Sequence, residues 1–160
     1  MPSVLCCCLG NIARSPMAEA VLRDIVKKRG IDQDFDVIDS CGTAGYHIGE
    51  EPDERTVEVC RKHGVEIKHE AQQLQRSDFD KFDYILAMDS WGNLKNIQKV
   101  QPKGSKAKVA LFGSFDDGKD IVDPYYGGME GFEKAYSQCV RYSEAFLKEL
   151  GYPPPSDAKM

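Results

Sequence analysis

The chain has 160 residues, which fits one domain with a substantial core. Its 41% hydrophobic and 29% charged residues are ordinary for a globular protein, and its net charge of −5 argues against a nucleic-acid scaffold, which needs basic patches. No apolar stretch approaches the ~20 residues that span a bilayer, and the N-terminus lacks the long apolar region of a secretory signal. We therefore expect neither nucleic acid nor a membrane as a partner.

Four β-like runs alternate with helical patterns along the chain. The runs cover residues 4–9, 35–40, 84–89 and 108–113. The first expected helix begins at Pro16, because proline suits the first helical position, and ends near Gly30. Further helices are expected over residues 53–63, 93–99 and 132–150. This alternation predicts an α/β fold with right-handed crossovers and a buried parallel sheet.

No internal repeat or domain boundary interrupts this pattern. We expect one domain over residues 1–150. Residues 151–160 are rich in proline and are expected to form a disordered tail without chemistry of their own.

The six cysteines are interpreted as reduced thiols in a cytoplasmic protein. Cys6, Cys7 and Cys8 are adjacent, so in a strand they point alternately to opposite faces, and an α/β chain of this length needs no disulfide framework. The chain has no compact histidine and cysteine spacing typical of a metal site, and we expect neither metal nor cofactor.

Between the first strand and the first helix, Cys8 stands six residues before Arg14, with Ser15 next. Such a loop turns backbone N–H groups inward and makes an anion nest at the positive end of the helix dipole. Gly10 in this loop is free to take unusual dihedral angles. Arg14 adds a planar fork that suits phosphate oxygens. A thiolate at the floor of this cradle would face phosphorus, which indicates phosphoryl transfer to cysteine.

A bare pair of cysteine and arginine at this spacing arises easily by chance. None of the other five cysteines has an arginine six residues later. The preceding strand, the following serine and the helix started by proline make coincidence much rarer. The alternative is a buried structural cysteine and a surface arginine in an ordinary connection between a strand and a helix.

The chain resembles the low-molecular-weight protein tyrosine phosphatases. The resemblance lies in VLCCCLGNIARSPMAEA at residues 4–20, DSCGT at 39–43, GYHIG at 45–49, FDYILAMD at 82–89 and DPYYG at 123–127, and it covers nearly the whole chain to about residue 150. It implies a doubly wound, four-stranded parallel sheet with helices on both faces. It also implies hydrolysis of protein phosphotyrosine and small aryl phosphates, an acid phosphatase activity.

A thiolate at Cys8 would attack phosphorus in line and form a phosphocysteine while Arg14 holds the equatorial oxygens. The helix N-terminus and Arg14 favour the thiolate, and Ser15 can donate its hydroxyl to the sulfur. The remaining substrate-binding residues are expected in the same loop: Leu9, Gly10, Asn11, Ile12 and Ala13.

The leaving aryloxide needs a proton, and Asp123 is the candidate general acid. By itself Asp123-Pro124 indicates only a turn, but the resemblance implies the acid, which then serves as base for the water that hydrolyses phosphocysteine. The resemblance also places Tyr125 and Tyr126 along one side of a substrate slot and Tyr46 on the opposite rim. A flat, deep slot suits a phenyl ring and excludes short phosphoserine side chains.

The resemblance further implies that Asn11, Ser40 and His69 hold the loop in shape by hydrogen bonds. Asparagine tolerates left-handed backbone, which supports Asn11. His69 could equally be an exposed histidine, and Asp89 could either face the site or cap a helix. No role is expected for His47 or His63.

Two positions depart from the family pattern. Ala13 stands where the family usually has a second cysteine, which removes a redox partner but not the nucleophile. The segment Met88-Asp89-Ser90-Trp91-Gly92-Asn93 is one residue longer than the usual Met-Asp-x-Ser-Asn, which puts Asp89 and the neighbouring rim in doubt.

Two other functions stay open. An arsenate reductase shares the cysteine loop but needs two further cysteines to relay a disulfide, and Cys41, Cys60 and Cys139 are widely spaced. A module that binds phosphotyrosine without turnover would not need Cys8, Arg14 and Asp123 together. The physiological substrate and the oligomeric state cannot be read from the sequence.

Overall fold

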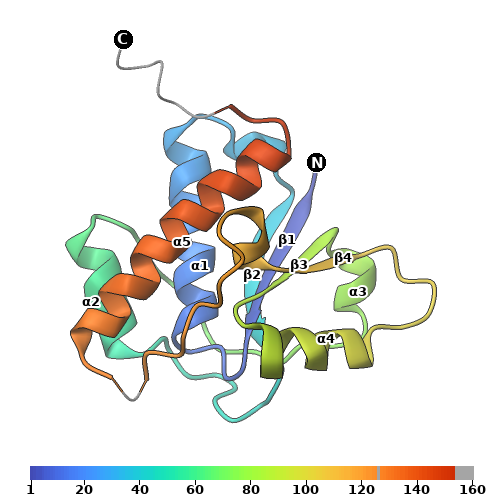
Figure 1. Ribbon diagram of the computed structural model, residues 1–160, viewed down its shortest axis with the longest axis horizontal. Coiled ribbons are helices and arrows are strands. Elements are labelled where there is room, and N and C mark those ends of the chain that lie inside the picture. The colour runs from blue at the N-terminus through green and yellow to red at the C-terminus, as the bar shows by residue number, and fades with distance from the viewer. Residues whose placement is uncertain (126, 154–160) are drawn as a thin grey trace.

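A computed structural model describes residues 1–125 and 127–153 and places one parallel sheet at the centre of the molecule (Figure 1). Its four strands lie in the order β2-β1-β3-β4. They are β1 (Ser3–Cys8), β2 (Val37–Gly42), β3 (Tyr84–Ala87) and β4 (Lys108–Leu111). The expected α/β class with a four-stranded parallel sheet is thereby confirmed.

The strand order puts the end of β1 at the switch point of the sheet. From β1 the chain moves outward to β2 on one side, and β3 then begins on the other side of β1. Ligands of doubly wound sheets bind beyond the carboxyl ends of the strands at such a point. Cys8 is the last residue of β1 and pairs in register with Gly42 of β2.

Helices cover both faces of the sheet (Figure 1). One core cluster joins α1, α2 and α5 to the sheet, and the other joins α3 and α4 to its opposite face. Cys6 and Cys8 belong to the first cluster and Cys7 to the second, so the alternation expected for these cysteines is confirmed. The helices are α1 (Arg14–Lys28), α2 (Glu54–Lys62), α3 (Asp78–Lys81), α4 (Lys95–Val100) and α5 (Met129–Glu149).

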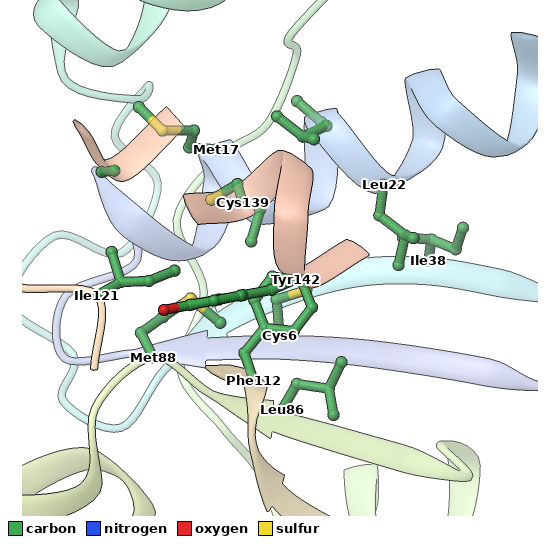
Figure 2. Close-up of a cluster of buried hydrophobic side chains, with 14 of the residues drawn as sticks. Cys6, Met17, Leu22, Ile38, Leu86, Met88, Phe112, Ile121, Cys139 and Tyr142 are labelled. Atoms are coloured by element: carbon green, nitrogen blue, oxygen red, sulfur yellow. The ribbon is translucent and has the colours of Figure 1, made fainter. Parts of the chain in front are cut away.

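The larger core lies between α5, α1 and the sheet (Figure 2). The apolar stripe of α5 recurs every three or four residues, which is the spacing of one helical face. Tyr142, a fully buried residue of this stripe, packs edge-on against Phe112, and its hydroxyl donates to Asp117 Oδ1 at 2.7 Å. The buried apolar residues of the stripe are Phe132, Ala135, Cys139, Tyr142 and Phe146.

Helix α1 begins at Arg14, two residues before the expected start at Pro16. Proline is tolerated there because the first four N–H groups of a helix have no partner within it. A helix over residues 93–99 was expected, but a π-helical turn, Ser90–Leu94, precedes a shorter α4. The short helix α3 was not expected, because four residues carry too little periodicity to reveal it.

Near the end of the described chain, Tyr152 is tied to the domain. Its hydroxyl donates to Asp34 Oδ2 at 2.9 Å, and its ring lies 6.0 Å from that of Phe35. The domain boundary at residue 150 stays a prediction, and residues 154–160 of the expected tail lie outside the described residues. Among the described helices, none is long and apolar enough to cross a membrane.

Candidate active site

The thiol of Cys8 lies at the floor of the loop that joins β1 to α1. Cys8 is only 3% exposed, and its Sγ lies 3.0 Å from Ser15 Oγ. The backbone N–H of Asn11 donates to the same sulfur at 3.3 Å. Since Ser15 belongs to the first turn of α1, the sulfur also lies at the positive end of that helix dipole. The sulfur therefore contacts two hydrogen-bonding groups at the start of α1.

The loop turns its carbonyl groups outward. Because a planar trans peptide points its N–H away from its C=O, the N–H groups of the residues that follow turn inward. This arrangement is the cradle of N–H groups that the sequence predicts. The outward carbonyls accept hydrogen bonds as follows: Cys8 from Thr43 N–H at 2.9 Å, Leu9 from Ala44 N–H at 2.9 Å, Ile12 from Asp53 N–H at 2.7 Å and Ala13 from the Thr56 hydroxyl at 3.3 Å.

The left-handed backbone of the loop belongs to Asn11. Asn11 has a φ of 59°, while Gly10 is not among the glycines of positive φ. A Cβ on Gly10 would lie 3.0 Å from His47 Cδ2, a tight contact that a small shift of the His47 side chain would relieve. Glycine is needed at Gly42, since a Cβ there would lie 2.7 Å from the Leu9 carbonyl oxygen, which belongs to the backbone.

Arg14 is held in place by two hydrogen-bond acceptors and lies near a third, longer ion-pair partner. It is 5% exposed, and its NH1 donates to Asp89 Oδ2 at 2.8 Å and to the carbonyl of Ile121 at 2.9 Å. Its NH2 lies 3.8 Å from Asp123 Oδ2. Two segments far along the chain therefore orient the guanidinium toward the cradle.

Asp89 both faces the site and caps a turn, so the two expected alternatives are realised together. Its Oδ2 pairs with Arg14, and its Oδ1 accepts from the N–H groups of Gly92 at 3.1 Å and Asn93 at 2.9 Å. The segment that follows Asp89 forms a π-helical turn, a kind of turn that is frequent at functional sites. The longer sequence leaves the carboxylate of Asp89 at the site.

Asp123 lies on the same hollow as the cradle. This hollow has a volume of about 300 Å³, and its walls include Cys8, Arg14, Asp123, Tyr46 and Tyr125. The carboxyl group of Asp123 is 44% exposed and accepts from the N–H of Tyr125 at 3.1 Å. Both described tyrosines of the expected slot line this hollow. Tyr126 lies outside the described residues.

Two residues of this region were missed from the sequence. His47 also lines the hollow, although no role was expected for it. Arg55 of α2 donates to the carbonyl of Tyr125 at 3.0 Å and lies over its ring at 5.2 Å, so it braces the segment that carries Asp123. The sequence holds no local signal for Arg55, because its partner lies 70 residues away.

The three expected support residues meet behind the loop. Asn11 Nδ2 donates to Ser15 Oγ at 2.8 Å and to Ser40 Oγ at 3.0 Å. His69 Nε2 lies 2.7 Å from Asn11 Oδ1, which also accepts from the N–H of Gln72 at 2.9 Å. These contacts fix the left-handed residue and, through Ser15, the surroundings of the thiol.

Glu19 belongs to this network and was missed. Its Oε1 accepts from the Ser40 hydroxyl at 2.7 Å and lies 3.2 Å from His69 Nδ1. Burial raises the pKa of Glu19 to about 7. The sequence does hold a signal for this role of Glu19, because Glu19 follows Ser15 by four residues and so lies on the same face of the helix.

Glu19, Asp39 and His69 could also be read as metal ligands, since one ligand atom of each lies within 4.8 Å of the others. The surroundings do not favour a cation there. Arg23 NH2 already lies 3.1 Å from Glu19 Oε2, and the oxygen of Glu19 nearest His69 is hydrogen bonded to Ser40. We interpret the group as the outer part of the loop support.

Fold and site together define a class: a doubly wound α/β protein with a cysteine under an anion cradle at the switch point of its sheet. A family model described as "Low molecular weight phosphotyrosine protein phosphatase" matches residues 3–153. The chain therefore belongs to the low molecular weight phosphotyrosine protein phosphatases, as the resemblance predicted, and the expected enzyme class is confirmed.

Known proteins are similar to this chain over almost its whole length. A protein of this family from Schizosaccharomyces pombe is 55% identical over 150 residues, which are 92% of this chain and 96% of that protein. The crystal structure of Primo-1 has a TM-score of 0.88 at 42% identity and covers 93% of this chain and 98% of its own. The structure of DARP, a Drosophila arginine phosphatase, has a TM-score of 0.87 at 35% identity and covers 96% of this chain and 100% of its own.

Proposed function

We propose that this protein hydrolyses protein phosphotyrosine and small aryl phosphates through a phosphocysteine intermediate. The observation that carries the proposal is the convergence of Cys8, Arg14 and Asp123 on one hollow. The family supports the phosphatase activity, and the proposal adds the mechanism and the residues that perform it.

In the first step, the thiolate of Cys8 attacks the phosphorus atom of the bound ester. The inward N–H groups and the guanidinium of Arg14 hold the three equatorial oxygens, whose charge must be stabilised in the transition state. Arg14 needs little reorganisation, because Asp89 and the carbonyl of Ile121 already fix one of its nitrogens. The bond between phosphorus and the aryl oxygen breaks as the bond between sulfur and phosphorus forms.

Asp123 completes both steps of the reaction. Its protonated carboxyl group gives a proton to the leaving aryl oxygen, and the resulting carboxylate then takes one from the water that attacks phosphocysteine. The exposure of its carboxyl group supports this role, since water reaches it directly. Hydrolysis releases inorganic phosphate and restores the thiolate of Cys8.

The walls of the hollow favour an aryl substrate. Tyr46 and Tyr125 both line it and can contact the two faces of a phenyl ring, while the cradle lies at its floor. A short phosphoserine side chain would not reach from the rim to the sulfur. Tyr126 is proposed to belong to the wall of Tyr125, as the resemblance implies.

Other functions receive less support. The cysteines available for an arsenate-reductase relay, Cys41, Cys60 and Cys139, are at most 1% exposed, and Cys60 and Cys139 lie in the core between helices and sheet. We also propose a cytoplasmic location, because all six cysteines are buried free thiols. Since one related structure is an arginine phosphatase, phosphoarginine must be compared as a substrate.

The proposal is tested by the release of phosphate from p-nitrophenyl phosphate, a phosphotyrosine peptide and phosphoarginine. The Cys8→Ser variant should lose release from both aryl substrates while still binding vanadate, because the cradle remains but an alkoxide does not form near neutral pH. Cys60→Ser is the matched control and should retain activity in its folded fraction.

Measurable turnover by Cys8→Ser would refute the nucleophile assignment. Arsenate reduction, phosphate binding without release, or a preference for phosphoarginine would each refute the proposed reaction.

A further inference from the structure

A second hollow adjoins the catalytic one. Its volume is about 540 Å³, and Leu9 and Tyr46 belong to the walls of both hollows. It extends from the loop after β2 to α4, which lies beside the loops at the carboxyl ends of the strands (Figure 1). Tyr46 is 73% exposed and forms the partition between the two hollows. A peptide that extends from the phosphate cradle on this side would pass directly over the second hollow.

The charge of the second hollow is opposite to that of the whole chain. Its lining includes the cations Arg76 and Lys99 and contains no aspartate or glutamate, although the chain has a net charge of −5. Neither cation forms an ion pair with any residue in the described part of the chain. Two unpaired cations at one hollow create a local attraction for anions.

The backbone segments that carry Arg76 and Lys99 are anchored to the rest of the domain. Phe79 is buried, and its N–H donates to the carbonyl of Arg76 at 3.2 Å, which anchors the backbone of Arg76 at the start of α3. Lys99 lies on α4, which is anchored in the core by Ile97. The hollow therefore combines apolar and polar wall residues with cationic groups on two separately anchored elements.

We propose that this hollow is a specificity subsite that binds an acidic side chain of the substrate peptide, one to three residues from the phosphotyrosine. The inference rests on the proposed function, since the catalytic hollow must hold the phosphotyrosine. Arg76 and Lys99 pair with the carboxylate, while Leu9, Tyr46 and Val100 contact the peptide backbone and the aliphatic part of the side chain. In an extended peptide, side chains two residues apart lie ~7 Å from each other, which suits two adjoining hollows.

The test compares kcat/KM for a phosphotyrosine peptide with glutamates at the flanking positions and for the same peptide with glutamines. The wild-type protein should favour the glutamate peptide by about five-fold, because exposed ion pairs each contribute modestly. The double variant Arg76→Gln/Lys99→Gln should reduce this ratio to about one. It should leave hydrolysis of p-nitrophenyl phosphate unchanged, because that substrate does not reach the second hollow.

The variant Lys103→Gln/Lys106→Gln is the matched control. It removes the same charge from exposed residues that do not line the hollow, and it should retain the five-fold ratio. The reversed variant Arg76→Glu/Lys99→Glu should favour a peptide flanked by lysine. The preference should weaken as salt is added.

A five-fold ratio that persists in Arg76→Gln/Lys99→Gln would overturn the inference. So would an equal loss of the ratio in Lys103→Gln/Lys106→Gln. Either result would mean that the preference for the glutamate peptide does not come from the second hollow. These results differ from failure of the proposed function, in which the wild-type protein would release phosphate from neither aryl substrate.

Discussion

At the scale of single residues, Asp123 lies close to the arginine that is proposed to bind the phosphoryl group. Its Oδ2 is 3.8 Å from Arg14 NH2. The proposed first step needs a proton from this carboxyl group for the leaving aryl oxygen.

This role of Asp123 predicts a dependence on the leaving group. Asp123→Asn should slow the first step on phosphotyrosine by about 10²–10⁴-fold, the usual contribution of a general acid. The loss on p-nitrophenyl phosphate should be less than about ten-fold, because p-nitrophenolate leaves without a proton.

Single-turnover rates are the proper measurement, since hydrolysis of phosphocysteine can limit kcat for both substrates. Glu50→Gln, an exposed carboxylate near the rim, is the control and should change neither rate. Equal losses on both substrates would show that Asp123 is not the acid.

At the scale of elements, neither β1 nor the loop that joins it to α1 holds a second cysteine placed to form a disulfide with Cys8. Cys6 shares its face of β1, but two residues apart in a strand the Cα atoms are ~6.5–7 Å distant with parallel side chains, which is poor disulfide geometry. Cys7 points to the opposite face. Ala13 occupies the position from which family members can offer a cysteine.

We therefore predict that peroxide oxidises Cys8 to sulfenic acid and then more readily to irreversible sulfinic acid. After a peroxide pulse and dithiothreitol, the wild-type protein should recover less activity than Ala13→Cys, which can trap the sulfenic acid as a disulfide within the loop. Activity and the intact mass are measured together. Full recovery of the wild-type protein, with a disulfide mapped to Cys8, would contradict this description of the loop.

At the scale of the whole molecule, the main core extends from Cys8 at the site to Phe146 at the far end of the sheet. The active-site loops follow the carboxyl ends of the strands (Figure 1). Phe146 lies near the end of α5, with its ring 5.2 Å from those of Tyr84 and Phe115. Tyr84 is the first residue of β3, at the opposite end of the sheet from Cys8. Stability and catalysis can therefore be changed separately.

Phe146→Ala should lower the free energy of unfolding by about 3–5 kcal/mol, because it leaves a cavity in a fully buried site. Phe146→Leu should cost less, since most of the volume is retained. Denaturant unfolding measures both effects. The kcat/KM of the folded fraction should stay unchanged in both variants, and a large loss in folded protein would show that α5 is coupled to the site.

The features that could be predicted from the sequence are local ones. Alternating runs predict the sheet, and the spacing from Cys8 to Arg14 predicts the cradle, because each depends on neighbouring residues. Arg55 and the double role of Asp89 depend on partners about 70 residues away and leave no local pattern. Gly42 is needed only because another segment approaches its Cα, which no reading of β2 alone reveals.

The central claim is that the phosphoryl group passes through Cys8, and trapping the intermediate tests it most directly. Asp123→Asn should form phosphocysteine from p-nitrophenyl phosphate and hydrolyse it slowly, so the intermediate should accumulate. After a denaturing quench and trypsin digestion, mass spectrometry should find one phosphoryl group on the peptide of residues 1–14, located at Cys8 by fragmentation. A phosphoryl group on another residue, or release of p-nitrophenol with none on the protein, would contradict the account.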